Sequence, residues 1–350
     1  MTLAMTVLRV TLVLAVVLAA LPLLRRQSAA LRAWVLAAAL AGAAILPLLQ
    51  LMAPAWGAPL AANAVLGVTN EWPKLLIGVW AAGFAAHLLV LVVGIVRLMG
   101  VAAAADPVRD GRHADVALDI AADYRVHAPV LLLEAERATL PVTWGHTQPK
   151  ILLPRSARNW SDERLRAVLC HEIAHVRRRD WLVQVAATLI RAVYWPHPLV
   201  WLACSRLRLE CERACDDAVL RGGIDGSRYA SHLLELARGV VEDRQHAPTA
   251  ALALRSTLEQ RVRSMLASHC NRSPVQRSLA AAVSMGMFVL AVGIAGWGGV
   301  VERSREFSVP PPKRLTLLLD GRIVDLSKEW PTYPNPRAGL VQGPGFPREF

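Results

Sequence analysis

Four long apolar segments constrain the fold of this chain more than any other feature of its sequence. They are residues 2–24, 31–53, 75–99 and 279–301. Each has about the 20 residues that a helix needs to cross roughly 30 Å of hydrocarbon. In the first segment the cationic pair Arg25 and Arg26 follows the apolar run, which is the reverse of a cleaved signal peptide. We therefore predict four membrane-spanning helices, three of them within residues 1–100.

The charges of the short loops predict how these helices are oriented. The loop 25–32 contains three arginines and no acid, whereas the loop 54–74 contains only Glu71 and Lys74 as charged residues. Because Lys and Arg near the ends of spans are retained in the cytoplasm, the first loop is expected inside and the second outside. This predicts a multi-pass protein of the inner membrane, with a cytoplasmic domain at 101–278. The N-terminus and the tail 302–350 are expected outside.

The overall charge fits a membrane protein. The net charge is +12 and the mean hydropathy is +0.36. Attraction to anionic lipid explains this charge, and the sequence has no basic stripe interleaved with aromatic residues, so direct nucleic-acid binding is not expected. All five cysteines fall in the predicted cytoplasmic segment, where reduced thiols are expected. They are Cys170, Cys204, Cys211, Cys215 and Cys270.

The predicted cytoplasmic segment contains a small sheet followed by helices. Residues 100–115 have the composition of a linker, and 116–124 predict a short helix. Three apolar runs separated by turns, at 129–135, 140–145 and 149–154, predict a small antiparallel sheet. Helices are expected over 162–178, 181–194, 198–222, 227–241 and 254–267. The predicted fold class is mainly α, a four-span helical membrane protein with a cytoplasmic α+β domain.

The sequence HEIAH at residues 171–175 predicts a metal site. His171 and His175 are four residues apart on one helix, so both imidazoles can reach one zinc ion. Glu172 lies beside them without being a ligand, in a position to take a proton from water. This pattern is typical of zinc hydrolases.

A catalytic zinc requires a third protein ligand, and LECERACDDAVL at 209–220 offers several. The acidic candidates are Glu210, Glu212, Asp216 and Asp217. Glu212 and Asp216 are four residues apart and share a helical face, so that one can bind zinc while the other supports a ligand histidine. Cys211 and Cys215 also share a face and could instead close a structural zinc site with the histidines.

The interval between the two motifs is apolar enough to suggest a fifth span. A single crossing would place Glu212 on the opposite side of the membrane from His171, and two crossings do not fit. We therefore expect helices that lie against the membrane interface. His197, between two prolines, is expected to be a turn residue. The arginines at 177–179 are expected to face solvent or lipid headgroups, with Asp180 pairing locally.

Together these residues resemble the BlaR/MecR family of integral-membrane zinc metallopeptidases, of the antirepressor type. The resemblance covers about residues 130–268 and rests on PVTWGHTQPKILLP, HEIAHVRRRD, WPHPLVW, ECERACDDAVL and LEQRVRSML. It implies a gluzincin with zinc held by His171, His175 and Glu212, Glu172 as the base, and Asp216 supporting a ligand. It also implies cleavage of a cytoplasmic repressor of the winged-helix type, and often of the protease's own chain.

The tail departs from the members of this family that sense β-lactams. No serine in the chain has a lysine three residues later, so acylation by an antibiotic is not expected. Asp320 and Gly321 lie between two apolar runs, which predicts a hairpin in the tail. The tail is expected either to bind an external ligand or partner or to be a remnant. Three alternatives to a regulatory peptidase fit the same sequence: a non-proteolytic transducer or scaffold with a structural metal, an HtpX-like quality-control protease, and, more weakly, a transporter. A homodimer is also compatible with the sequence.

Overall fold

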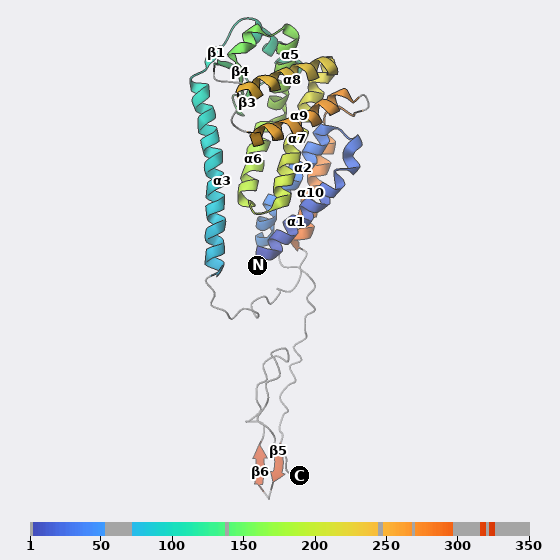
Figure 1. The fold of residues 1–350 in the computed structure, drawn as a ribbon. Coiled ribbons are helices and arrows are strands. Elements are labelled where there is room, and N and C mark those ends of the chain that lie inside the picture. Colours follow the sequence, from blue (N-terminus) through green and yellow to red (C-terminus); the bar gives the residue numbers. More distant parts are fainter. Residues whose placement is uncertain are drawn as a thin grey trace. The chain divides into compact units, whose positions relative to one another are not determined.

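The structure is a computed structural model that describes residues 3–52, 72–136, 140–243, 248–267, 270–296, 316–319 and 322–325. The chain divides into two compact units, Met1–Gly298 and Gly299–Phe350. All helices and the larger sheet belong to the first unit, whose elements are labelled in Figure 1. The predicted division into domains at residues 101, 279 and 302 remains a prediction.

Four apolar helices coincide with the four predicted spans. They are α1 Leu3–Ala20, α2 Ala29–Met52, α3 Trp72–Ala103 and α10 Arg277–Gly296, with a short 3₁₀ helix, η1 Leu23–Arg26, between the first two. In the described part of the chain, three stretches are long and apolar enough to cross a membrane: Ala29–Leu49, Lys74–Ala103 and Arg277–Gly296. The apolar part of α1, Met5–Ala20, is shorter. The number of four spans therefore stays a prediction.

The remaining helices lie close to the predicted positions. They are α4 Arg112–Asp123, α5 Asp162–Arg178, α6 Asp180–Val193, α7 Pro198–Arg221, α8 Gly226–Asp243 and α9 Pro248–Leu266. The hydroxyl of Ser161 accepts a hydrogen bond from the backbone N–H of Arg164, which caps the start of α5. Arg179 adopts a left-handed conformation with φ of 57°, which ends α5 and allows α6 to begin at Asp180.

The sheet differs from the predicted antiparallel one. Its four strands are β1 Asp106–Val108, β2 Leu131–Ala135, β3 Val142–Trp144 and β4 Lys150–Pro154, in the spatial order β1-β2-β4-β3. β2 and β4 pair in parallel. The two edge strands pair antiparallel with their neighbours, β1 with β2 and β3 with β4. The prediction failed because β3, between β2 and β4 in sequence, lies at the edge, which allows β4 to run parallel to β2. The segment read as a linker supplies β1 at the other edge.

The apolar interval between the two motifs forms a helical hairpin, α6 and α7, which packs against α1, α2 and α3 (Figure 1). Small residues of the hairpin, such as Ala187 and Ala203, are buried against the apolar helices. The position of the hairpin against the membrane interface stays a prediction. His197 is more than a turn residue, since its buried ring meets the hydroxyl of Thr11 on α1 at 2.9 Å.

The first unit has two main hydrophobic cores, and α7 contributes to both. One core joins α1, α2, α10 and the start of α7 through Val200. The other packs β2, β4, α5 and α8 around the end of α7 at Val219. Leu153 and Ile173 are fully buried in the second core, and each such side chain stabilises the fold by about 1.5–3 kcal/mol. The middle of α7, where the acidic motif lies, is thereby held between the two cores.

In the second unit, β5 Thr316–Leu319 and β6 Arg322–Asp325 pair antiparallel. This pairing confirms the predicted hairpin strands. The turn residues Asp320 and Gly321 lie outside the described residues, as does the Pro- and Gly-rich end of the tail.

Candidate metal centre

The HEIAH motif lies in the C-terminal half of α5, on the side that faces α7. His171 and Glu172 are both buried, and His175 is partly buried. Because a helix repeats every 3.6 residues, His171 and His175 lie one turn apart, and their Nε2 atoms are 3.2 Å from each other. The helix is fixed by apolar neighbours such as Leu169 and Ile173, which are buried in the second core.

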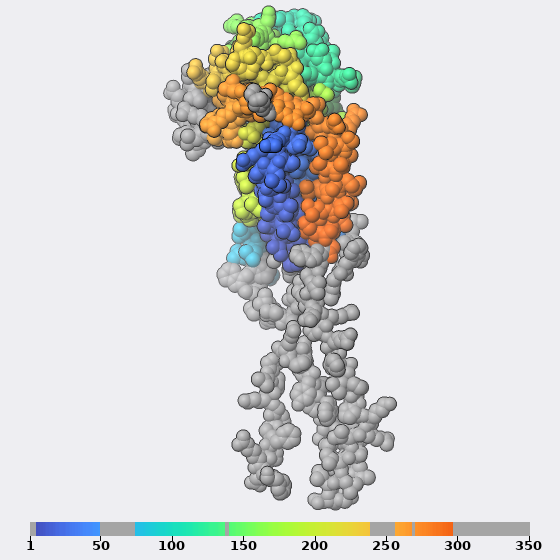
Figure 2. Space-filling view, turned by 90° about the vertical axis from the view of Figure 1, so that its right-hand side faces the viewer, coloured from blue at the N-terminus to red at the C-terminus, as the bar shows by residue number. Residues whose placement is uncertain are grey.

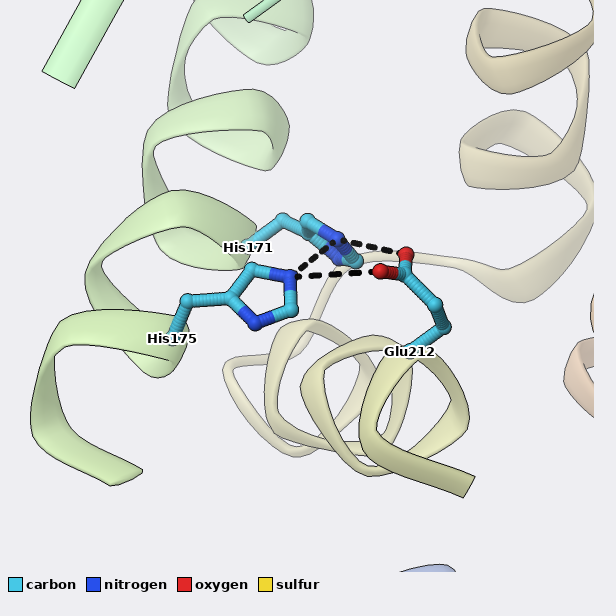
Figure 3. Close-up of side chains that lie close together, drawn as sticks. All are labelled: His171, His175 and Glu212. Carbon is cyan, nitrogen blue, oxygen red and sulfur yellow. Dashed lines mark hydrogen bonds and ion pairs between the residues drawn. The ribbon is translucent and has the colours of Figure 1, made fainter. Parts of the chain in front are cut away.

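Glu212 of α7 completes a group of three donors (Figure 3). Its Oε2 atom lies 3.5 Å from Nε2 of His171, and its Oε1 atom lies 3.8 Å from Nε2 of His175. Ligand atoms about 2.0–2.2 Å from a tetrahedral zinc ion are separated by about 3.3 Å. Two imidazole nitrogens and one carboxylate oxygen at these spacings therefore fit a divalent cation such as zinc, with one position left for a non-protein ligand.

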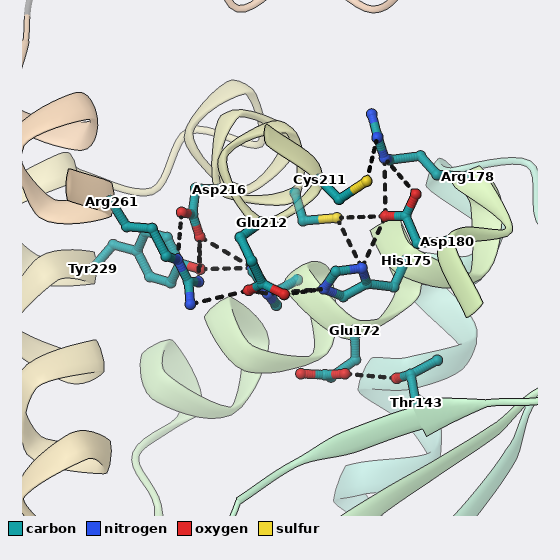
Figure 4. A network of polar contacts seen from close by, with 12 residues as sticks. Thr143, Glu172, His175, Arg178, Asp180, Cys211, Glu212, Asp216, Tyr229 and Arg261 are labelled. Atoms are coloured by element: carbon teal, nitrogen blue, oxygen red, sulfur yellow. Dashed lines mark hydrogen bonds and ion pairs between the residues drawn. The ribbon is translucent and has the colours of Figure 1, made fainter. Parts of the chain in front are cut away.

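A polar cluster of Asp216, Tyr229 and Arg261, labelled in Figure 4, holds the far nitrogen of His171. Tyr229 Oη lies 3.0 Å and Asp216 Oδ1 lies 3.2 Å from Nδ1 of this ring. Asp216 is fully buried and receives two hydrogen bonds from Arg261, at 2.9 and 2.7 Å. Arg261 also pairs with Glu212 at 3.1 Å. Asp216 thus contacts a histidine of the motif. A carboxylate that supports a ligand histidine is expected at such a position.

The far nitrogen of His175 has an equivalent partner in Asp180 (Figure 4). Asp180 Oδ2 lies 2.9 Å from Nδ1 of His175, and Arg178 donates to the same carboxylate at 3.0 and 3.2 Å. Burial raises the pKa of Asp180, but His175 and Arg178 outweigh it, and the pKa is lowered overall. Both histidines therefore have a buried carboxylate at Nδ1, which leaves Nε2 directed at the shared centre.

Cys211 and Cys215 of α7 lie beside Arg178 and Asp180 (Figure 4). The thiol of Cys215 lies 3.4 Å from Nδ1 of His175 and 3.5 Å from Asp180, and these three residues form a second possible donor group. The group uses the ring nitrogen that faces away from Glu212. Burial raises the pKa of Cys215 well above its usual range, which disfavours the thiolate that a metal would require.

The other acidic candidates of α7 point elsewhere. Glu210 is buried in ion pairs with Arg32 at 2.8 Å and with Arg213 at 3.0 Å. Asp217 lies 3.5 Å from Arg272. Neither belongs to a group of donors in the described part of the chain.

Electrostatics make the centre attractive to a cation. Burial lowers the pKa of His171, but hydrogen bonds with Asp216 and Glu212 outweigh it and raise the value to about 10. Burial raises the pKa of Glu212, but the opposite effects of Arg261 and His171 are larger. The pKa is therefore lowered overall, and the carboxylate is ionised. The same balance lowers the pKa of Asp216 to about 2. A partly buried carboxylate, Glu212, and a buried one, Asp216, thus stabilise positive charge at the histidines.

Glu172 projects to the other side of α5, toward the sheet (Figure 4). The hydroxyl of Thr143 on β3 donates a 2.6 Å hydrogen bond to Oε2 of Glu172. A cleft of about 240 Å³ lies here, lined by residues that include Thr143, Gly145 and His175. Gly145 has a φ of +92°, and a Cβ atom there would meet the carbonyl of Gln148 at 2.8 Å, so this turn requires glycine.

Sequence reasoning singled out His171, Glu172, His175, Glu212 and Asp216, and the structure brings all five together. It missed Asp180, Thr143, Tyr229 and Arg261. The sequence indicates Asp180 only as a local partner of the arginines, although its position five residues after His175 is a signal. The other three come from distant segments, and no spacing in the sequence connects them to the motif.

The comparisons with known proteins identify the family of this chain. A model of the BlaR1 peptidase M56 family matches residues 6–266. The chain is 35% identical over 99 residues to the regulatory protein BlaR1 of Bacillus licheniformis, which is 28% of this chain and 16% of that protein. It is 23% identical over 82 residues to the methicillin resistance mecR1 proteins of Staphylococcus aureus and Staphylococcus epidermidis, 23% of this chain and 14% of each.

The matched stretches thus span less than a fifth of the length of these relatives. The family model, in contrast, extends from α1 through the sheet, both motifs and the end of α9. Because it covers most of the chain, this protein belongs to the BlaR1 peptidase M56 family.

Proposed function

We propose that this protein is a membrane-bound zinc endopeptidase that cleaves a cytoplasmic protein in signal transduction. The observation that supports this most strongly is the convergence of His171, His175 and Glu212, with Glu172 beside them and facing an edge strand. When bound by these three residues, zinc supplies a Lewis acid that polarises the scissile carbonyl and makes water a nucleophile near neutral pH.

Within this proposal Glu172 acts as the general base and then as the general acid. Its carboxylate accepts a proton from the attacking water and then donates it to the leaving amine. Thr143 holds this carboxylate in place through the 2.6 Å hydrogen bond. Asp216 and Asp180 hold the two ligand histidines at their Nδ1 atoms, so that both Nε2 lone pairs stay directed at the metal.

An extended substrate would add to the sheet at β3. This strand lies at one edge of the sheet and contributes Thr143 to the cleft beside His175. Peptides commonly bind proteins by adding a strand to such an edge. The backbone of the substrate would then run along β3 beside the HEIAH helix, with its scissile bond near Glu172.

For topology, we propose that α1, α2, α3 and α10 cross the inner membrane, with the catalytic domain in the cytoplasm and the tail outside. The charge of the loop 25–32 supports this orientation. The hairpin of α6 and α7 starts and ends on the side of the metal centre, so it does not move Glu212 across the membrane. A winged-helix repressor is the proposed substrate, by analogy with the family.

The deciding experiment compares the parent with Glu172→Gln in cells, by mapping new N-termini among the cytoplasmic proteins and measuring zinc in the purified chain. We expect equal zinc content and loss of the parent's cleavage products. Glu163→Gln, on an exposed position of the same helix, is the matched control and keeps the products. Identical products from Glu172→Gln would show that the mechanism is wrong.

The main alternative is a structural metal site in a non-proteolytic transducer. It requires a closed set of protein ligands that includes Cys215, whose thiol lies near His175. Cys215→Ala therefore separates the two functions. Under our proposal this variant binds zinc with the parent's affinity and still cleaves, whereas under the alternative it loses the metal.

A further inference from the structure

A second cavity, of about 560 Å³, lies where α2 and α10 begin, against α5, α6 and α7. In Figure 2, α10 (orange) stands beside the N-terminal helices α1 and α2 (blue). The cavity shares Arg177 and Arg179 with the cleft beside the metal centre, but none of the residues proposed to bind zinc lines it. No step of the proposed hydrolysis uses this space.

One part of the lining is strongly cationic. Its charged residues are Arg177, Arg178, Arg179, Arg221, Arg272, Arg277, Asp180 and Asp217. The two carboxylates already have partners, since Asp180 pairs with Arg178 at 3.0 Å and Asp217 lies 3.5 Å from Arg272. Within the described part of the chain, neither Arg179 nor Arg277 forms an ion pair. The cavity therefore has an excess of positive charge that the protein does not neutralise.

These cations are close enough to affect one another. Burial lowers the pKa of Arg221, and Arg177 and Arg178 lower it further, against the opposite effect of Asp217. Arg177 lies over the ring of Tyr124, 6.0 Å from its centroid, which leaves its charge near the cavity. An anionic group among these guanidinium groups would relieve the repulsion and accept several charge-assisted hydrogen bonds.

The other part of the lining is apolar. It contains Ala30, Ala33 and Ala37 of α2, together with Val183 and Leu207 of the hairpin. The alanines recur at helical spacing, so their small side chains leave a continuous space along α2. Trp34 fixes the neighbouring helix, because its indole nitrogen donates to the carbonyl of Ala280 on α10 at 3.0 Å. Tryptophan at the end of an apolar helix is typical of the membrane interface.

A ligand that suits both parts has an acidic head and an apolar tail. Inorganic phosphate would leave the alanine-lined wall uncovered, and a neutral lipid would leave the arginines unpaired. Basic pockets between membrane helices on the cytoplasmic side bind acidic lipid headgroups in other proteins. The positions of Arg277 at the first residue of α10 and of Ala30 near the start of α2 place this cavity at the depth of such headgroups.

We propose that this cavity binds one anionic phospholipid, with its phosphate among Arg179, Arg221 and Arg277 and an acyl chain along α2. The proposal rests on the membrane location of α2 and α10 and does not depend on catalysis. Glu172→Gln should therefore retain the lipid even though it cannot cleave.

The test uses the full chain in detergent, with retained lipid measured by native mass spectrometry. Phosphatidylglycerol and phosphatidylcholine with the same acyl chains are added separately, and inorganic phosphate serves as a third ligand. We expect one phosphatidylglycerol to be retained at least fivefold more than phosphatidylcholine, and no comparable binding of phosphate. This fivefold difference corresponds to about 1 kcal/mol, the typical gain for one arginine near an anionic headgroup.

The double variant Arg179→Gln/Arg277→Gln should reduce retention of phosphatidylglycerol by roughly tenfold or more. Neither side chain has an ion-pair partner among the described residues, so the fold is not expected to depend on them. Arg166→Gln/Arg263→Gln removes the same charge at two positions outside the cavity and should retain the lipid. Equal retention of the two lipids, unchanged retention by the first double variant, or phosphate binding as strong as that of the lipid would each overturn the proposal.

Discussion

Asp180 Oδ2 lies 2.9 Å from Nδ1 of His175, across the ring from the Nε2 atom that faces His171 and Glu212. The left-handed turn at Arg179 produces this contact, because it ends α5 and starts α6 within one residue. The buried carboxylate selects the tautomer that carries its proton on Nδ1 and thereby leaves Nε2 free to bind a metal. A local feature of the backbone thus determines the orientation of a proposed ligand.

This relationship predicts the effect of Asp180→Asn. We expect zinc affinity to fall about 10- to 100-fold, the usual effect of removing a carboxylate that supports a ligand histidine. The measurement is a competition titration with a chelator of known affinity. Asp162→Asn, at an exposed position on α5, serves as the control and should leave the affinity unchanged. Equal affinity for Asp180→Asn and the parent would show that Asp180 has no positioning role.

Glu212 and Glu210 are expected to behave oppositely. Glu212→Gln should lose most of the bound zinc and keep the fold, since this carboxylate faces the two histidines. Glu210→Gln should keep the zinc but destabilise the fold by about 3 kcal/mol, because it leaves Arg32 without its buried partner. Metal content and thermal unfolding of the two variants measure these effects. If Glu212→Gln kept its zinc and Glu210→Gln lost it, Glu210 would be the zinc ligand and Glu212 would not.

The sequence predicted the helices and the proposed metal ligands because both depend on local periodicity. The spacing of His171 and His175 is a property of one helix, and the third donor lay within a short acidic segment of another. Patterns of this kind are visible without tertiary information. The choice between Glu210 and Glu212, in contrast, required knowledge of where Arg32 lies.

The parts that sequence reasoning missed depend on contacts between distant segments. Tyr229 and Arg261 reach the centre from α8 and α9, and no pattern in either helix marks them as polar partners of Asp216. The parallel pairing of β2 and β4 was also missed, because the alternation of apolar residues does not specify the order of strands. The cationic cavity joins five helices and has no signature in any one of them.

Thr143 provides a test of how Glu172 is positioned. Thr143→Val keeps the shape and strand preference of the side chain but removes the 2.6 Å hydrogen bond to Glu172. We expect kcat to fall about tenfold with little change in KM, because a hydrogen bond to a charged group is typically worth about 1.5–3 kcal/mol. Thr143→Ser restores the hydroxyl and should recover most of the rate. If both variants lose activity equally, the hydroxyl is not the cause.

The raised pKa of Asp217 predicts that the stability of the fold depends on pH. Burial raises the pKa of this carboxyl to about 6, although Arg272 and Arg221 lower it, and Asp216 beside it raises it further. Since the usual value is 3.8, the folded protein holds this proton more tightly than the unfolded chain does between about pH 4 and 6. The stability that this proton contributes is therefore present at low pH and is lost as the pH rises through about 6.

Asp217→Asn removes this titration, because an amide stays neutral throughout. Arg272 keeps its backbone acceptors at Met265 and Ala267 in the variant. As the pH rises from 5 to 8, we expect the free energy of unfolding of the variant to increase relative to that of the parent by about 1–3 kcal/mol. The upper figure is the full free energy of the pKa difference. Thermal unfolding of both proteins at a series of pH values measures this gain. A constant difference between them across this range would mean that Asp217 does not titrate there, and that Arg272 holds it ionised at pH 5.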